Sequence, residues 1–199
     1  KKGAPQILKN VDGVLIPGGF GSRGVEGKIA AIRYVRENKI PFFGICLGMQ
    51  VAIIEIARDL CGLKDADSSE FNPDSSAPVV DIMETQRGIN AKGGTMRRGA
   101  YPCVIKKGSR AHVAYGATDI SERHRHRYEV NNGYRQTLEK AGVEFSGLSP
   151  DESLVEIMEF RHHPWFLACQ FHPEFKSRPL MPHPLFRGFV KAVMAHKAQ

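Results

Sequence analysis

The sequence predicts an α/β fold with a mostly parallel central sheet and helices on both of its faces. Two apolar runs, at residues 11–16 and 40–45, are typical of buried strands, and each precedes a stretch with the length and periodicity of a helix. This β-α-β-α alternation is the pattern of a parallel sheet covered by helices. Short strand-like runs after residue 140 predict an additional antiparallel subset of strands.

The first sixty residues carry this alternation. The first apolar run ends at a glycine-rich turn at residues 17–21, and Ile29, Ile32 and Val35 then recur at the spacing of helical turns. The expected elements are a loop at 1–10, a strand at 11–16, a helix ending near 38–39, a strand at 40–45 and a helix at 49–60. Because such sheets bind ligands beyond the carboxyl ends of their strands, the two strand-end turns point to one crevice.

The alternation ends after residue 60. Residues 61–78 are polar and rich in Asp, Ser and Pro, which predicts a long loop of the kind that carries function or is disordered. Residues 86–99 are glycine-rich and basic, and they fit either a mobile lid or a disordered connection. The remaining expected elements are strands at 79–83, 101–106 and 122–130, a helix at 134–141, strands at 145–148, 154–160 and 165–171, and a closing helix after His183 with Leu185, Phe186, Phe189, Val190 and Val193 on one side.

The composition indicates one globular domain. With 199 residues, 42% of them hydrophobic, the chain can bury a full core. Its 28 basic and 21 acidic residues give a net charge of +7, but the basic residues are mostly scattered, which argues against nucleic-acid binding. Four cysteines far apart, without a CxxC pair, favour a reducing compartment over a disulfide framework. No apolar run has the length of a membrane span, so we expect a soluble, cytoplasmic chain.

Cys46 is the strongest candidate for a nucleophile. It follows an apolar strand directly, within Gly44-Ile45-Cys46-Leu47-Gly48, and a helix is expected behind it. This is the cysteine counterpart of the Gly-x-Ser-x-Gly elbow, in which a sharp turn exposes the nucleophile. The helix N-terminus is expected to favour thiolate over thiol and to offer free backbone N–H groups. The alternative is a buried structural cysteine between two packing glycines.

His172 and Glu174 are the candidates for the partners of Cys46. A cysteine nucleophile needs a base within hydrogen-bond reach and a group that orients that base. Both residues follow the last expected strand, and two residues apart on an extended segment they point the same way. The carboxylate of Glu174 can then hold the tautomer of the His172 ring. The alternative is an ordinary turn at the end of a strand.

The segment 123–127, Arg-His-Arg-His-Arg, predicts a strand that recognises an anion. Alternation along a strand separates two sets of side chains: Arg123, Arg125 and Arg127 on one face, and His124, His126 and Tyr128 on the other. An arginine that ends near the crevice can bind a substrate carboxylate through two hydrogen bonds. The alternative is a solvated basic edge strand.

Histidine pairs raise the question of a metal site. His124 and His126 lie among arginines, whose charge disfavours a cation, and His162 and His163 precede a proline in an expected turn. Metal sites need converging ligands, usually with a cysteine or carboxylate partner. We therefore expect no metal.

Together, these strings resemble the class I, triad-type glutamine amidotransferases, and among them the glutaminase domains of CTP synthases. The class-level resemblance rests on Pro17-Gly18-Gly19, Gly44-Ile45-Cys46-Leu47-Gly48-Met49-Gln50 and Gln170-Phe171-His172-Pro173-Glu174. The narrower one rests on Pro17-Gly18-Gly19-Phe20-Gly21-x-Arg23-Gly24, Ser69-Glu70-Phe71, Gly93-Gly94-Thr95-Met96-Arg97, Arg123-His124-Arg125-His126-Arg127-Tyr128-Glu129-Val130-Asn131 and His172-Pro173-Glu174-Phe175. In order and spacing they cover the chain from about residue 11 to its end.

The resemblance implies a role for each matching position. Cys46 attacks the side-chain amide of glutamine to give a γ-glutamyl thioester, His172 serves as base and acid, and Glu174 orients it. Backbone N–H groups of Leu47 and of the Gly18-Gly19 turn hold the oxyanion. The implied glutamine-binding residues are Gly19, Leu47, Gln50, Glu70 and Arg127, with Glu70 on the substrate ammonium and Arg127 on its carboxylate. Arg97 resembles part of a lid that responds to GTP.

The resemblance also implies a flavodoxin-like sheet and a larger enzyme. Glutaminase domains of this family open with a further strand and helix and are joined to an amidoligase domain, neither of which precedes residue 1 in this sequence. We therefore expect residues 1–199 to be a single glutamine amidotransferase domain of a longer polypeptide. No cofactor is expected in it; ATP, Mg²⁺ and UTP belong to the amidoligase domain, and GTP is the implied activator. The full-length enzyme is expected to be a homotetramer that aminates UTP to CTP with ammonia from L-glutamine.

Two other functions compete with this one. A γ-glutamyl hydrolase or an intracellular-protease-like hydrolase shares the fold and the elbow, but lacks the strings at residues 93–97 and 123–127. A regulatory or filament-forming module with a vestigial triad is the second alternative. The presence of Cys46, His172 and Glu174 together argues against it.

Overall fold

The computed structural model describes residues 3–83 and 96–198. Its helices and strands are α1 (Ala4–Leu8), β1 (Val14–Ile16), α2 (Val25–Glu37), β2 (Phe42–Ile45), α3 (Leu47–Asp59), β3 (Ala66–Ser68), β4 (Ala77–Ile82), β5 (Arg97–Ile105), α4 (Arg110–Tyr115), β6 (Asp119–His126), β7 (Tyr128–Val130), α5 (Arg135–Lys140), β8 (Val143–Leu148), β9 (Val155–Phe160), β10 (Phe166–Cys169) and α6 (Pro184–Lys197). Two 3₁₀ turns, η2 (Asn132–Tyr134) and η3 (Pro173–Phe175), complete the set. The expected alternation before residue 60 and the three late strands are confirmed.

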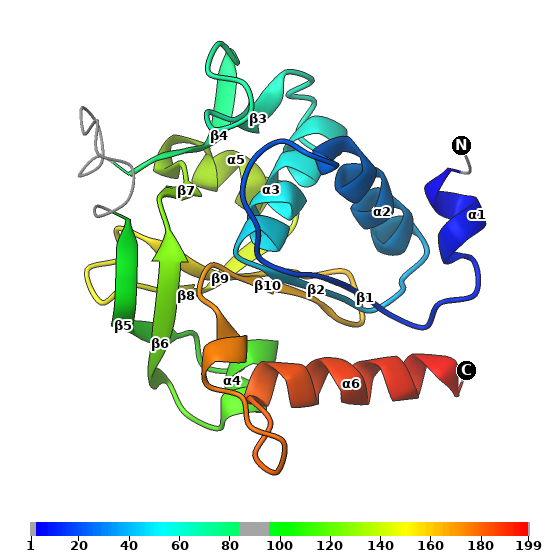
Figure 1. Ribbon diagram of the computed structural model, residues 1–199, viewed down its shortest axis with the longest axis vertical. Coiled ribbons are helices and arrows are strands. Elements are labelled where there is room, and N and C mark those ends of the chain that lie inside the picture. Colours follow the sequence, from blue (N-terminus) through cyan, green and yellow to red (C-terminus); the bar gives the residue numbers. More distant parts are fainter. Residues whose placement is uncertain (1–2, 84–95, 199) are drawn as a thin grey trace.

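The predicted α/β fold class is confirmed, and within the described residues the central sheet has seven strands (Figure 1). Its order is β1-β2-β10-β9-β8-β5-β6. The neighbours β1, β2 and β10 run parallel, whereas β9, β8, β5 and β6 extend the sheet through antiparallel pairings. A separate three-stranded sheet, β3-β4-β7, lies beside it. The turn at Cys46 follows β2, one of the parallel strands. The sheet β3-β4-β7 lies next to this turn.

Helices cover both faces of the central sheet (Figure 1). Alternate residues of each central strand face opposite sides, so Phe42 and Phe166 join the core under α2, α3 and α5. Their neighbours Phe43 and Leu167 join the second core, under α4 and α6. No helix in the described part of the chain has the length and apolar character that a membrane span requires.

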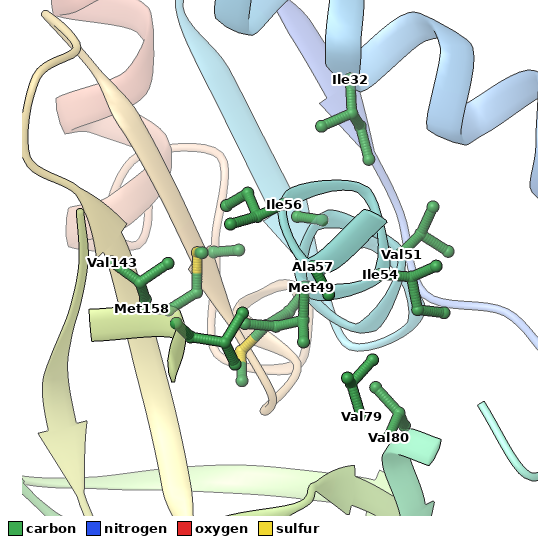
Figure 2. Close-up of a cluster of buried hydrophobic side chains, with 14 of the residues drawn as sticks. Ile32, Met49, Val51, Ile54, Ile56, Ala57, Val79, Val80, Val143 and Met158 are labelled. Carbon is green, nitrogen blue, oxygen red and sulfur yellow. The ribbon is translucent and has the colours of Figure 1, made fainter. Parts of the chain in front are cut away.

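Helix α3 is the centre of the larger core. Its residues from Leu47 to Ala57 are all buried, and Figure 2 shows Ile54 beside Val79 and Val80 of β4. Its one buried carboxylate, Glu55, lies 2.8 Å from the guanidinium of Arg36 on α2. A helix enclosed on this many sides holds its first residue, and therefore the preceding Cys46, in a fixed position.

Two segments expected to be loops contain regular structure. Residues 4–8 form α1, with Pro5 in the first turn, where a missing N–H costs no hydrogen bond. Within the segment 61–78, β3 pairs in parallel with β4. The sequence of β3, Ala-Asp-Ser, has no apolar run, so only its pairing with a distant strand reveals it.

Two further expectations are corrected by tertiary packing, and one helix was not predicted. The strand expected at 122–130 is two strands in different sheets, because the chain bends at Arg127. Val190 of α6 is 53% exposed, so it is not part of the packed face of that helix. The short helix α4, which contributes the buried Ala111 to the second core, was not expected.

Gly48 sets how closely α3 approaches β1. A Cβ at this position would lie 2.3 Å from the backbone oxygen of Ile16, which cannot rotate away as a side chain can. We expect Gly48→Ala to lower the free energy of unfolding by about 1–3 kcal/mol. The control is Gly27→Ala on the exposed side of α2, where a Cβ meets nothing within 4 Å and should add about 0.5–1 kcal/mol of stability. Urea unfolding measures both, and equal changes in the two variants would contradict the packing argument.

Candidate active site

Cys46 lies at a sharp turn between β2 and α3. Its φ of 50° and ψ of −103° form a conformation that residues with a Cβ rarely adopt. The turn is held because the Cys46 N–H donates to the Cys169 carbonyl at 2.7 Å, while the Cys46 carbonyl accepts from the Met49 N–H at 3.0 Å. Strain that the surrounding structure maintains is typical of nucleophile elbows.

Three parallel strands bring the predicted triad region to one edge of the sheet. The last residue of β1 is level with Gly44, and the last residue of β10 is level with Ile45. The turns after these strands therefore lie side by side. A Cβ placed on Gly18 would be 2.7 Å from Cε1 of His172 and 3.6 Å from Cβ of Cys46. A side chain at Gly18 would thus fill the space between nucleophile and base.

His172 and Glu174 form the predicted pair. Nδ1 of His172 lies 2.5 Å from Oε1 of Glu174, and since a carboxylate oxygen accepts, the ring proton is on Nδ1. Burial acts to raise the pKa of Glu174, but the hydrogen bonds from His172 and from the backbone hold that pKa below its ordinary value. The other ring nitrogen, Nε2, is buried and has no hydrogen-bond partner among the described residues. It is therefore available to take a proton from a neighbouring group.

The thiol of Cys46 is protonated in this site. Burial raises the pKa of Cys46 to about 12, although the Leu47 N–H bonds to the sulfur and acts in the opposite direction. The carboxylates of Glu174, Glu70 and Glu129 add to the rise. The helix N-terminus favours the thiolate as expected, but removal from water outweighs this one backbone N–H group. Cys46 therefore needs a base that removes its proton before the sulfur can act as a nucleophile.

The pH dependence of Cys46 alkylation tests this state. Because the pKa is raised to about 12, the rate of reaction with iodoacetamide should climb steadily from about pH 6 to about pH 10. Peptide mapping by mass spectrometry separates Cys46 from the more exposed Cys61. A rate that is already constant near neutral pH would show a preformed thiolate and contradict this assignment.

A cavity of about 290 Å³ opens beside Cys46. Its wall includes four of the predicted glutamine-binding residues: Gly19, Gln50, Glu70 and Arg127. The Glu70 carboxylate accepts from the Gly21 N–H at 3.0 Å, which ties the segment after β3 to the glycine turn after β1. The Gln50 amide donates to the Tyr128 carbonyl at 3.0 Å. The cavity thus combines a nucleophile with one anionic and one cationic side chain.

The groups predicted to hold an oxyanion adjoin the sulfur. Leu47 is the first residue of α3, and its N–H contacts the Cys46 thiol. Gly19 lines the cavity, and a Cβ there would come within 3.0 Å of the Leu47 side chain. Their role toward a substrate stays a prediction, as does that of Gly18.

Arg127 occupies the bend between β6 and β7. Arg123 and Arg125 are exposed and His124 and His126 are buried, as alternation predicts. Arg127 departs from that pattern, because β7 leaves the central sheet to pair with β4 and Arg127 lines the cavity. The expectation of one face shared by all three arginines is therefore wrong for Arg127, which lines the cavity together with Cys46.

Arg97 lies in a buried polar cluster at the start of β5. One of its Nη atoms is 2.7 Å from Glu156, the other is 3.6 Å from Glu129, and the guanidinium stacks 4.4 Å from the ring centroid of Tyr101. With 7% of its surface exposed, Arg97 does not face solvent. Most of the lid expected at residues 86–99 lies outside the described residues, and the GTP response of Arg97 stays a prediction.

Sequence reasoning missed a contact of the Cys46 sulfur and several side chains that line the cavity. The Gln170 amide nitrogen lies 3.7 Å from the Cys46 sulfur, and its oxygen accepts from Gln50 at 3.4 Å. Phe20, Met96, His126 and Tyr128 also line the cavity. One feature of the sequence could have revealed Gln170. It lies one residue beyond β10, which runs parallel to β2, and is therefore level with Cys46.

The histidine pairs have structural partners. His124 and His126 contact each other at 2.8 Å, and His163 is buried 3.2 Å from the Val35 carbonyl. In residues 3–83 and 96–198, no group of three histidine, cysteine or carboxylate side chains converges as metal ligands do.

The comparisons with known proteins agree with this geometry. The family model of class-I glutamine amidotransferases matches residues 2–192. CTP synthase of Geobacter metallireducens is 59% identical over 198 residues, which are 100% of this chain and 37% of that protein. CTP synthase of Moorella thermoacetica is 61% identical over 192 residues, 96% of this chain and 36% of that protein. The chain thus spans little more than a third of these relatives.

Solved structures give the same result. The glutaminase domain of Trypanosoma brucei CTPS, with bound acivicin, superposes with a TM-score of 0.91 at 45% identity over 96% of this chain and 74% of that one. A putative GMP synthase subunit from Thermoplasma acidophilum shares the fold, with a TM-score of 0.65 at 16% identity over 98% of this chain and 79% of that one. The chain therefore belongs to the class I glutamine amidotransferases and, within them, to the glutaminase domains of CTP synthases.

Proposed function

We propose that this chain hydrolyses L-glutamine to glutamate and ammonia through a γ-glutamyl thioester on Cys46. The observation that supports this most is the combination of a cysteine at a strained elbow, a His172–Glu174 pair and a cavity lined by Glu70 and Arg127. Membership of the family supports the same reaction. A free amino acid carries one positive and one negative group, and the cavity offers a partner for each.

The first half-reaction forms the thioester. Nε2 of His172 removes the proton of the Cys46 thiol, and the sulfur attacks the side-chain amide carbon of glutamine. The carbonyl oxygen becomes an oxyanion, which the N–H groups of Leu47 and Gly19 stabilise, with Gly18 leaving the space that it needs. When the tetrahedral intermediate collapses, His172 returns the proton to the amide nitrogen, which leaves as ammonia. Glu174 stabilises the imidazolium that exists between the two transfers.

The second half-reaction regenerates the enzyme. His172 takes a proton from a water molecule that attacks the thioester carbon, and the carbon–sulfur bond breaks. The proton returns to the sulfur of Cys46, and glutamate leaves. The raised pKa of Cys46 favours this return, because the buried thiol is more stable than the buried thiolate.

Substrate recognition uses the two ends of the amino acid. Glu70 binds the α-ammonium group and Arg127 binds the α-carboxylate, which a guanidinium can hold through two parallel hydrogen bonds. Gln50 lies on the same wall with its amide held by the Tyr128 carbonyl. The distance between these anchors and Cys46 then selects the side-chain length of glutamine.

The ammonia serves a larger cytoplasmic enzyme in this proposal. The curated relatives are CTP synthases of which the chain spans about 37%. We place this domain beside an amidoligase domain that uses UTP, ATP and Mg²⁺, within a homotetramer that GTP activates. The acceptor of the ammonia is then UTP, and the product is CTP.

Ammonia release from matched amides tests the proposed reaction. The chain is incubated with glutamine, with asparagine and with a γ-glutamyl dipeptide, and ammonia and free glutamate are measured. We expect kcat/KM for glutamine to exceed the other two by about 10²-fold or more, because the anchors and the side-chain length must both fit. Preference for the dipeptide would identify a γ-glutamyl hydrolase, and no turnover by the folded chain would identify a catalytically silent module.

A further inference from the structure

The bend between β6 and β7 is where the main chain directs Arg127 into the cavity. Along β6, Arg123 and Arg125 are exposed, so a continued strand would place Arg127 on that exposed face. Instead β7 pairs with β4, and the Met83 N–H donates to the Arg127 carbonyl at 3.1 Å. The direction of the Arg127 side chain therefore depends on what holds the bend.

The Tyr128 carbonyl is the point where the bend is held. It accepts from the Gln50 amide of α3 at 3.0 Å and lies 3.2 Å from Nδ1 of His126. A carbonyl oxygen only accepts, so Nδ1 of His126 carries a proton and donates it. One oxygen thus joins the end of β6, the start of β7 and α3, the helix that follows Cys46.

A buried chain fixes His126 in this tautomer. With Nδ1 protonated, Nε2 accepts, and Nδ1 of His124 donates to it at 2.8 Å, a shorter contact than the 3.4 Å to Arg97. Nε2 of His124 then carries no proton and has no hydrogen-bond partner among the described residues, although Glu156 lies 3.4 Å away and accepts from Arg97 at 2.7 Å. Burial lowers the pKa of His126 to about 3, so the ring is neutral near pH 7. His126 is 2% exposed, and it lies at the wall of the cavity beside Arg127.

We infer that His126 is a positioning residue for substrate recognition: its Nδ1–H holds the Tyr128 carbonyl and thereby keeps Arg127 directed at the α-carboxylate of glutamine. This inference rests on the proposed glutaminase function. It assigns His126 no contact with the reacting atoms. It predicts that loss of the Nδ1–H donor weakens glutamine binding while the Cys46 chemistry continues, because misplacement of an anchor by about 1 Å is costly.

Two substitutions by amide residues distinguish the roles of the two ring nitrogens of His126. The amide nitrogen of asparagine is attached to Cγ, as Nδ1 is, so His126→Asn keeps a donor to Tyr128 and loses the acceptor for His124. The amide of glutamine lies one bond further out, where its oxygen can accept from His124 as Nε2 does, so His126→Gln keeps the acceptor and loses the donor to Tyr128. We expect the glutamine KM of His126→Gln to rise by about tenfold or more with kcat within about threefold, and the KM of His126→Asn to stay within about threefold.

A double variant tests whether His126 acts through Arg127. In an Arg127→Ala background, His126→Gln should raise KM no further, because the anchor that it positions is absent. Thermal unfolding of each variant separates this effect from general destabilisation, which would lower both melting temperatures alike and leave KM unchanged. Equal KM values for the Asn and Gln variants, or additive effects with Arg127→Ala, would overturn the inference. If the unsubstituted chain releases no ammonia, the proposed function itself fails, which is a distinct result.

Discussion

Cys46→Ala is expected to lower the rate of glutamine hydrolysis by at least about 10⁴-fold. The reaction needs an atom that forms a covalent bond to the amide carbon, and alanine offers none. His172 and Glu174 remain in place in this variant, and water would have to replace sulfur in a cavity shaped around Cys46. Ammonia release at saturating glutamine measures the loss.

The controls for this prediction use the other cysteines and the substrate. Cys61 is partly exposed and its thiol contacts the Thr137 carbonyl, far from the cavity lining, so Cys61→Ala should retain activity within about twofold. Glutamine should still raise the melting temperature of Cys46→Ala, because Glu70 and Arg127 are intact. Hydrolysis that survives in Cys46→Ala would exclude the thioester mechanism.

Arg127→Ala is expected to raise the KM for glutamine by about 10²-fold or more. A carboxylate that enters the cavity leaves water, and without the guanidinium it has no cationic partner on that wall. The effect should fall mainly on KM, because the ground state and the transition state carry the same α-carboxylate. Steady-state kinetics over a wide range of glutamine concentrations gives both constants.

Two matched variants define the role of Arg127. Arg127→Lys keeps the charge but not the planar pair of donors, so an intermediate KM is expected. Arg123→Ala removes an exposed guanidinium from the same run of arginines and should leave KM unchanged, because only the backbone of Arg123 contacts His172. An unchanged KM in Arg127→Ala would mean that the carboxylate binds elsewhere.

Local patterns were sufficient to predict the sharp turn at Cys46 and the contact between His172 and Glu174. Gly44 and Gly48 flank Cys46 because the turn admits no side chain there, and that requirement is visible as a string in the sequence. His172 and Glu174 are two residues apart, so their contact is local, although Glu174 lies in the 3₁₀ turn η3 and not in the extended segment that was expected. The parallel strands that bring them to Cys46 follow from the alternation of apolar runs and helices.

Features that depend on distant partners could not be predicted in this way. The polar strand β3 exists through its pairing with β4, and the bend at Arg127 exists because β7 joins that second sheet. The net shift in the pKa of Cys46 could not be predicted for a related reason. A helix N-terminus is visible in the sequence, but the burial that outweighs it is a property of the whole core. Arg97 was assigned to a lid, yet Glu156 and Glu129 hold it inside the protein.

The most direct test of the thioester mechanism is covalent labelling with a diazo-ketone analogue of glutamine. The sulfur of the nucleophile displaces N₂ from this reagent and forms a stable thioether, which peptide mapping locates. We predict a single adduct on Cys46, prevented by excess glutamine and lost in Cys46→Ala. An adduct on Cys61, Cys103 or Cys169 in its place, or labelling that glutamine does not prevent, would contradict the assignment of Cys46 as the glutaminase nucleophile.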